Sequence, residues 1–288
     1  MISIFYLALA AIGLIGAGVT YWRSAHKAEL LILFAFSAAV ILFADWIAFG
    51  VFGLYDYSPG LVADNVADSA LGEFLAEAVF VPSLVLVLVS WLPGLTGMVV
   101  GTAIVAGLEV WMSSLGLYHC AGWFLWFTVA GFAVYFAALD LFWHDLTHRT
   151  YPFSRVRLFL RGALVFDMLA FLALILRAQQ WVVTRIFIMP TYIQNQALGR
   201  LISYPLVAGP VSYWVLCGEG AGRWVRLGLV TGGLAAMNLL LTTLSIQLFV
   251  PPYHWSIDAL AQGTSILLAA LAEDAIVAQY RRQHQRLA

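Results

Sequence analysis

The sequence predicts an all-α, polytopic membrane helix bundle, and three observations lead to this fold class. Hydrophobic residues make up 63% of the 288 residues, whereas charged residues make up only 10%. The mean hydropathy is +0.92, and a soluble domain would carry about a quarter charged residues. The apolar residues also fall into segments of roughly 20, the length that a helix needs to cross a bilayer. The formal net charge of −1 argues against nucleic acid as a partner.

The spans can be placed in order along the chain. The first 22 residues are apolar, no positively charged side chain precedes them, and Arg23 and Lys27 follow them. This is the reverse of a secretory signal, so we interpret the segment as a retained transmembrane helix. Eight further segments have the length and composition of spans. The nine predicted spans are residues about 2–22, 30–52, 71–92, 96–116, 123–144, 157–177, 197–217, 225–249 and 256–278.

Arginine and lysine side chains predict the orientation of these spans. With nine spans most of them fall on one side of the membrane, and the excess of basic residues marks the cytoplasmic side. We therefore expect a protein of the inner (cytoplasmic) membrane with its N-terminus outside and its C-terminus in the cytoplasm. The basic residues on the cytoplasmic side would be Arg23, Lys27, Arg149, Arg155, Arg157, Arg161, Arg223, Arg226, Arg281, Arg282 and Arg286.

An internal repeat is predicted from three pairs of similar segments. The sequence "ADWIAF" at 44–49 resembles "FDMLAF" at 166–171, residues 70–82 resemble 197–210, and residues 108–123 resemble 237–255. Asp140 likewise corresponds to Asp274. We predict an extra N-terminal helix and loop (1–28), a first four-span repeat (29–148), and a second four-span repeat with a cytoplasmic tail (149–288). An even number of spans per unit makes the two repeats parallel.

Two phrases of the first repeat place an acid before a glycine-leucine-tyrosine turn. Asp45 precedes the turn in "ADWIAFGVFGLYDYSPG" (44–60), and Glu109 precedes it in "LEVWMSSLGLYHCAGW" (108–123). Glu73 and Glu77 lie four residues apart and would share a helix face. Charged groups inside a bilayer cost about 2.5 kcal/mol or more each, so these acids should face the bundle interior.

Clustered carboxyl groups in apolar surroundings favour the protonated form of one of them, which makes a general acid. In the second repeat Arg200 replaces Glu73 and Asn238 replaces Glu109. The glycine-rich stretches 97–107 and 228–236 indicate close packing of the fourth and eighth spans, which would bring Asn238 near Glu109. The alternative is that the acids cap helices and pair with Arg200 and aromatic residues to fix the packing.

Metal and cofactor chemistry finds little support in the sequence. Asp140, His144 and His148 form one helical stripe and are weak metal candidates, but a stripe at the membrane interface explains them equally well. Six histidines are too few for a histidine-box di-iron site. Lys27 is the only lysine and lies in a loop, which excludes a retinal Schiff base. No cofactor is therefore predicted.

Residues 45–82 resemble the membrane lycopene-cyclase domain of carotenoid synthesis. The resemblance rests on Asp45, on the turn around Gly53, Tyr55, Tyr57 and Pro59, on Glu73, and on Pro82. It implies a cofactor-independent enzyme that protonates an isoprenoid double bond, with Glu73, Glu77 or Glu109 as the acid and Asp45 beside them. Aromatic faces would stabilise the cation. The expected substrate-binding residues are Tyr55, Tyr57, Tyr118, His119, Trp123, Asn238 and Arg200.

Three functional hypotheses follow from the sequence. The first is a carotenoid- or isoprenoid-modifying cyclase or hydratase. The second is a transporter or carrier of a lipophilic solute or of protons, since parallel repeats are a known transporter plan. The third is a non-catalytic subunit of a membrane complex, in which the acids serve packing. The expected partners are the lipid bilayer, a lipophilic small molecule and other membrane subunits.

Overall fold

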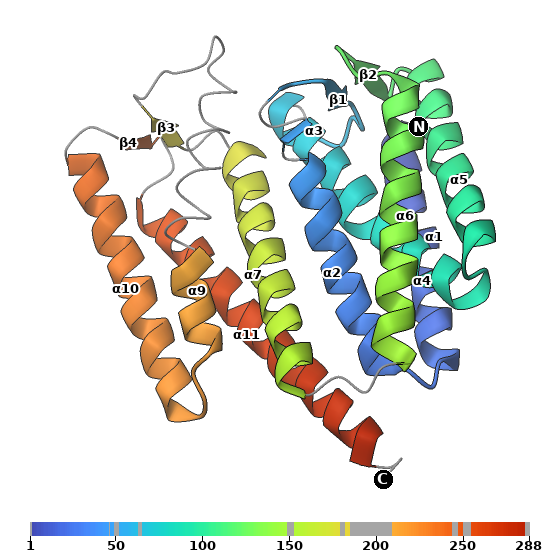
Figure 1. Ribbon diagram of the computed structural model, residues 1–288. Coiled ribbons are helices and arrows are strands. Elements are labelled where there is room, and N and C mark those ends of the chain that lie inside the picture. Colours follow the sequence, from blue (N-terminus) through green and yellow to red (C-terminus); the bar gives the residue numbers. More distant parts are fainter. Residues whose placement is uncertain are drawn as a thin grey trace.

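The computed structural model describes residues 2–45, 47–48, 52–62, 65–148, 153–178, 182–184, 209–243, 247–249 and 255–285. Helices dominate these residues and stand side by side as a bundle (Figure 1). The helices are α1 (Ile2–Arg23), α2 (Lys27–Asp45), α3 (Asn65–Glu73), the π-helix η2 (Phe74–Phe80), α4 (Val81–Trp91), α5 (Leu95–Ser114), α6 (Leu125–His148), α7 (Phe153–Ala178), α9 (Gly209–Leu216), α10 (Ala221–Thr243) and α11 (Trp255–Gln285).

Six helical segments among the described residues are long and apolar enough to cross a membrane. They are Ile4–Arg23, Lys27–Asp45, Asp68–Trp91, Leu95–Ser114, Leu125–His148 and Leu260–Gln283. These segments correspond to the first five predicted spans and to the ninth, and they confirm a multi-pass membrane helix bundle. The predicted span 157–177 coincides with α7, and 225–249 overlaps α10. Most of the predicted span 197–217 lies outside the described residues, so the number nine stays a prediction.

Four short strands depart from the purely helical prediction. Strand β1 (Tyr55–Tyr57) pairs antiparallel with β2 (Tyr118–Cys120), and β3 (Val182–Thr184) pairs with β4 (Gln247–Phe249). Thus the two segments that contain the glycine-leucine-tyrosine turns form one two-stranded sheet. Gly53 and Gly116 precede the strands with φ angles of 61° and 69°, a left-handed conformation that favours glycine. The pairing ties the connection after α2 to the connection between α5 and α6.

Helix α2 is the centre of the packing because it is buried on two faces. One stripe, which includes Ala28, Ile32 and Ala35, packs into a core shared with α7, α9, α10 and α11. Another face, with Leu30 and Leu33, packs into a core shared with α1, α4 and α6. Both stripes follow the three- and four-residue spacing of a helix. In contrast, α5 and α6 pack mainly on each other at one edge of the bundle (Figure 1).

A π-helical segment interrupts the third span. Pro82 lies in the first turn of α4, immediately after η2. Proline lacks the amide hydrogen that an α-helix needs, and its ring crowds the carbonyl group four residues earlier. The wider turns of a π-helix relieve this conflict, and such segments are frequent at functional sites. Pro82 thus lies where the span changes from π-helix to α-helix.

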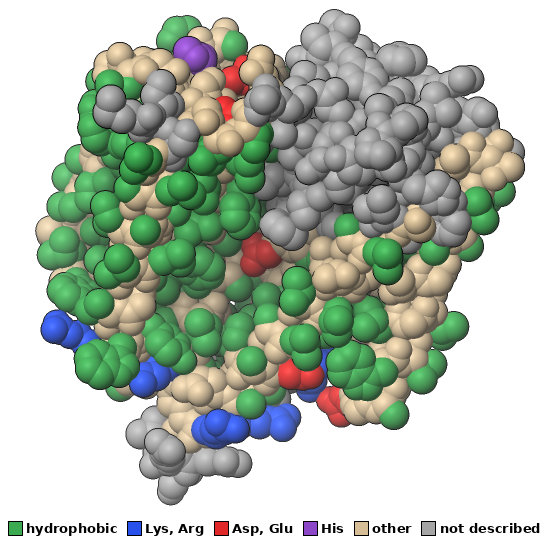
Figure 2. All heavy atoms as spheres, turned by 180° about the vertical axis from the view of Figure 1, so that it is seen from behind, with side chains coloured by type: hydrophobic (Ala, Val, Ile, Leu, Met, Phe, Trp, Pro, Cys, Tyr) green, Lys and Arg blue, Asp and Glu red, His purple; other side chains and the backbone are tan. Residues whose placement is uncertain are grey.

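The two ends of the bundle differ in charge. The lysine and arginine side chains visible in Figure 2 gather at one end, which we call the basic end. Strands β1 and β2 lie at the opposite end, where α1 begins, whereas α11 ends at the basic end (Figure 1). We call the end with β1 and β2 the strand end. The distribution agrees with the expected separation of N- and C-termini.

Candidate functional site

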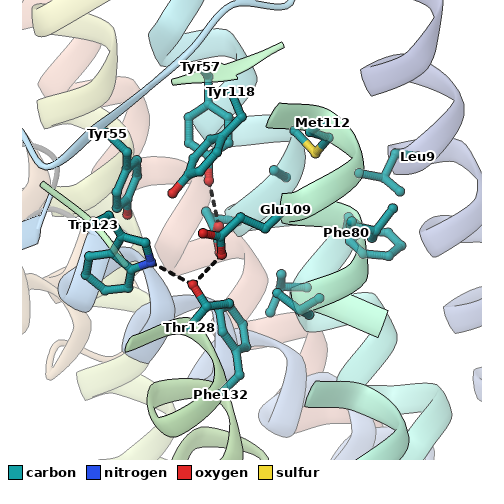
Figure 3. A pocket seen from close by; sticks show the side chains of 15 residues that line it. Leu9, Tyr55, Tyr57, Phe80, Glu109, Met112, Tyr118, Trp123, Thr128 and Phe132 are labelled. Carbon is teal, nitrogen blue, oxygen red and sulfur yellow. Dashed lines mark hydrogen bonds between the residues drawn. The ribbon is translucent and has the colours of Figure 1, made fainter. Parts of the chain in front are cut away.

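A pocket lies at the strand end, beneath β1 and β2 and between α1, η2, α5 and α6 (Figure 3). Its cavity measures about 70 Å³. Two carboxyl groups from helices far apart in the sequence, those of Glu77 and Glu109, line it together with aromatic and apolar side chains. Among the described residues that line it there is no lysine, arginine or histidine. We call it the acid pocket.

Glu77 reaches the pocket from η2. Its Oε1 atom accepts a hydrogen bond from the Tyr57 hydroxyl at 2.7 Å. Its other oxygen is buried and accepts no hydrogen bond from the described residues. Tyr57 is fixed in turn, because its backbone N–H donates to Ser69 Oγ at 3.1 Å and its ring meets the Tyr6 ring edge-on at 6.2 Å. One carboxyl oxygen of Glu77 is therefore positioned by its surroundings while the other can serve a ligand.

Glu109 reaches the pocket from α5 and is positioned from the facing helix α6. Thr128 donates a short hydrogen bond to the Glu109 carboxyl group. The indole N–H of Trp123 donates to Thr128 Oγ1 at 2.6 Å. Figure 3 shows both hydrogen bonds meeting at the Thr128 hydroxyl, with Trp123 on one side and Glu109 on the other. The donor series Trp123–Thr128–Glu109 thus fixes the direction of the threonine hydroxyl.

Aromatic rings form the side of the pocket nearest the strands. The Tyr118 ring lies 5.4 Å from the Tyr55 ring and 5.3 Å from the Tyr57 ring, and the Trp123 ring lies 5.4 Å from that of Tyr55. Burial raises the pKa of Tyr57 and of Tyr118, and the nearby carboxyl groups of Glu77 and Glu109 raise them further. Both hydroxyls therefore stay protonated at neutral pH.

Asp45 and Glu73 are buried near the pocket but do not line it. Asp45 is the last residue of α2, and its carboxyl group accepts a short hydrogen bond from the Tyr55 hydroxyl. It therefore acts on the pocket through a ring that does line it. Glu73 is 5% exposed and ends α3, one turn before Glu77. We expected Glu73 and Glu77 to share one helix face at the site. Glu77 lines the pocket, whereas Glu73 does not.

Two expected substrate-binding residues, His119 and Asn238, do not line the acid pocket, and a third cannot be placed. His119 is exposed on β2, opposite Asp56, and does not line the pocket. Arg200 lies outside the described residues. Asn238 belongs to α10, which stands at the opposite edge of the bundle from α5 (Figure 1), so its predicted place beside Glu109 is wrong.

The physical reason for the error about Asn238 is that α2 and α7, not α5 and α10, pack along the middle of the bundle. A Cβ atom added at Gly107, Gly228, Gly232 or Gly233 would meet no atom within 4 Å. These glycines therefore face outward instead of joining two helices.

The weak metal candidates do not gather into a site. The His144 and His148 rings stack at 4.1 Å, and Asp140 accepts a hydrogen bond from the Gly94 backbone N–H at 3.0 Å. The described part of the chain contains no group of three or more histidine, cysteine, aspartate or glutamate side chains that could hold a metal ion. Asp140 satisfies the amide of the residue before α5.

Sequence reasoning missed Thr128, the direct partner of Glu109. Thr128 is 2% exposed in an otherwise apolar helix. A buried hydroxyl needs a hydrogen-bond partner, so its polarity was a usable signal, although the sequence does not show which acid it would meet.

No family model, no curated protein and no solved structure matches this chain. The function has therefore to be argued from the site itself.

Proposed function

We propose that the protein is an integral membrane enzyme that protonates a carbon–carbon double bond of a lipophilic, isoprenoid-type molecule in the acid pocket, as a cyclase or a hydratase. One observation carries this proposal: Glu77 and Glu109, from separate helices, line one aromatic pocket that has no basic side chain among its described lining residues. Ionisable side chains inside a membrane are functional candidates by default, because their burial is costly.

The surroundings suit an acid that must be neutral before it reacts. An apolar environment disfavours the carboxylate, and a second carboxyl group nearby disfavours it further. We assign Glu77 as the general acid, because its second oxygen is buried and accepts no hydrogen bond from the described residues. Tyr57 binds the first oxygen at 2.7 Å and can stabilise the carboxylate left after proton transfer.

The proposed step balances without a cofactor. The proton of Glu77 and the two π electrons of the substrate form a new C–H bond, which leaves a carbocation on the neighbouring carbon. In a cyclase a second double bond attacks the cation, and a proton then returns to a carboxylate. In a hydratase water attacks instead and loses a proton. Glu109 is the second carboxyl group available to take up that proton.

Aromatic faces are the groups that stabilise a buried cation without reacting with it. The rings of Tyr55, Tyr118 and Trp123 lie together on one side of the pocket (Figure 3). A cavity of about 70 Å³ is smaller than pockets that enclose a whole drug-sized ligand. We therefore propose that only the reacting end of the substrate enters, while the rest stays in the bilayer beside α5 and α6.

We also propose the two parallel repeats and the cytoplasmic location of the basic end. The element order supports the repeats: β1 follows α2 and pairs with the strand between α5 and α6, and β3 follows α7 and pairs with the strand between α10 and α11. Asp140 of α6 binds the backbone N–H of Gly94 before α5, and Asp274 of α11 binds Arg223 in the first turn of α10. In both cases an aspartate of the later helix binds the start of the preceding one, which supports the proposed correspondence of Asp140 and Asp274.

The test is conversion of a linear, unsaturated carotenoid such as lycopene by the full-length protein in membranes. Glu77→Gln and Glu109→Gln should lower the rate by about 10²- to 10⁴-fold, the usual contribution of general acid–base catalysis. Glu73→Gln distinguishes the pocket from the sequence resemblance, because Glu73 is buried one turn away and does not line the pocket. The pocket predicts a rate near that of the wild type for this variant.

Substrate conversion by the wild type that persists in both Glu77→Gln and Glu109→Gln would contradict the proposal. Each variant is first compared with the wild type by size-exclusion chromatography in detergent, so that misfolding is not mistaken for loss of chemistry.

A further inference from the structure

A second cavity, of about 300 Å³, lies at the basic end between α7, α10 and α11. Among the described residues its charged lining consists of three arginines and two acids: Arg157, Arg223, Arg281, Glu219 and Asp274. We call it the arginine cavity. We propose that it binds a phosphate group, and that its lining is suited to the headgroup of an anionic phospholipid. This site is separate from the acid pocket and does not depend on the proposed enzyme function.

A single buried carboxylate, that of Glu273, holds two of the three lining arginines, Arg157 and Arg223, and also Arg161, which does not line the cavity. Glu273 is 0% exposed. Its Oε1 atom accepts hydrogen bonds from Arg157 Nε at 2.8 Å and from Arg161 Nε at 2.7 Å. Its Oε2 atom accepts one from Arg223 Nη2 at 3.0 Å. Because Glu273 already binds them, the guanidinium groups need little reorganisation when an anion arrives, which favours binding.

The arginines differ in what they can offer a ligand. Arg223 is occupied, since it also donates to the carbonyl oxygens of Gly218 and Leu216 and to Asp274. On its outer side the Nη1 atom of Arg157 donates to Glu219 at 2.8 Å, and the Glu219 side chain is 76% exposed. Exposed ion pairs contribute little. A phosphate, which has more acceptor oxygens, can therefore replace Glu219 on Arg157.

The charge of the cavity matches that of a phosphodiester. Three guanidinium groups and two carboxylates leave one net positive charge on the lining. A phosphodiester carries one negative charge. Arg281 lines the cavity and is exposed near the end of α11, so a ligand can reach it from outside the bundle.

The apolar part of the lining indicates a lipid as the source of the phosphate. Trp224, Val277 and Ala278 complete the cavity, and the Trp224 side chain is 49% exposed. Tryptophan is enriched where a membrane meets water. Basic pockets between transmembrane helices at the cytoplasmic side are known to bind anionic headgroups. A volume of about 300 Å³ is at the lower limit of ligand pockets and suits a headgroup.

The experiment measures binding of phosphatidylglycerol to the purified full-length protein in a neutral detergent by native mass spectrometry. Phosphatidylcholine is the zwitterionic comparison, and inorganic phosphate is added as a competitor. Arg281→Gln should weaken phosphatidylglycerol binding by about tenfold or more, the cost of one charge-assisted hydrogen bond. Arg282→Gln is the matched control, because it removes the same charge from the next residue, which does not line the cavity.

Tighter binding of phosphatidylglycerol than of phosphatidylcholine, lost in Arg281→Gln and kept in Arg282→Gln, is the expected result. Displacement of the lipid by millimolar inorganic phosphate would keep the phosphate site but assign it to a soluble ligand. Equal binding of the two lipids, or equal losses in the two variants, would overturn the proposal. Unfolding temperatures without lipid show that both variants are folded.

Discussion

The protein has glutamates inside both ends of the bundle, half-buried in the acid pocket and fully buried at the basic end, and surrounds them in opposite ways. At the basic end Glu273 is fully buried and accepts hydrogen bonds from the nitrogen atoms of three arginines, at 2.7, 2.8 and 3.0 Å. In the acid pocket Glu77 and Glu109 receive hydrogen bonds from hydroxyl groups, those of Tyr57 and Thr128. The residue type is the same, and only the partners differ.

This difference decides what each acid can do. The arginines beside Glu273 neutralise its buried charge, so this glutamate serves the structure. A hydroxyl donor carries no charge, so it does not neutralise a carboxylate as an arginine does. The protonation state of Glu77 and Glu109 therefore depends on their apolar surroundings. Buried acids in a membrane protein are therefore better sorted by their partners than by their burial.

The largest expected effect comes from replacing a glutamate by glutamine at each end, which keeps the shape of the side chain and removes its charge. Glu273→Gln should lower the free energy of unfolding by about 3–5 kcal/mol, because it leaves arginines buried without their counter-charge. Glu77→Gln should change it by no more than about 1 kcal/mol, because the glutamine oxygen still accepts from Tyr57 and no cation is left unpaired. Denaturant unfolding in detergent measures both. Equal losses of unfolding free energy in the two variants would show that Glu77 is as important to the fold as Glu273.

The sequence predicted the helical architecture because the bilayer limits the length of a span. The first predicted span, 2–22, corresponds to α1 at Ile2–Arg23, and the fourth, 96–116, to α5 at Leu95–Ser114. Hydropathy reports burial in lipid directly, so such segments are readable without knowledge of their neighbours. It also indicated correctly that acids lie inside the bundle.

The partners of those acids could not be predicted. Glu77 and Glu109 line one pocket beneath β1 and β2, and strand pairing across 61 to 65 residues leaves no periodic signal in either segment. Helix packing in lipid depends on shape and small residues more than on hydropathy. Glu273 was overlooked, although it interrupts an apolar stretch as Glu77 does. A charged side chain inside a bilayer is costly and should face the bundle interior, and this argument applies to Glu273 as well.

A second, smaller effect tests whether packing positions the acid pocket. A Cβ atom at Gly72 would come within 2.6 Å of Tyr57 Cβ and 3.1 Å of Pro59 Cδ. Gly72→Ala should therefore cost about 1–3 kcal/mol, as overpacking does, and lower the proposed activity by moving Tyr57 from Glu77. Gly107→Ala is the control, since its Cβ atom would meet nothing within 4 Å. Chemical unfolding and substrate conversion measure the two effects, and identical behaviour of the two variants would refute this role of packing.

The smallest effect concerns Glu219, the exposed acid of the basic end. The hydrogen bond and the charge of Arg157 lower the pKa of Glu219. A carboxyl group with a lowered pKa in the folded state stabilises the fold above its unfolded pKa of about 4.3, and this contribution is lost as the pH falls through the folded pKa.

The unfolding temperature of the wild type should therefore exceed that of Glu219→Gln slightly at pH 7, and the difference should vanish in acid. Salt should also reduce it, because the Glu219 side chain is 76% exposed and exposed charges are screened. The effect of Glu273→Gln should persist in salt, because the Glu273 side chain is 0% exposed. If salt instead reduced both differences alike, the buried network would be open to solvent, and the contrast between structural and reactive glutamates would have to rest on the acid pocket alone.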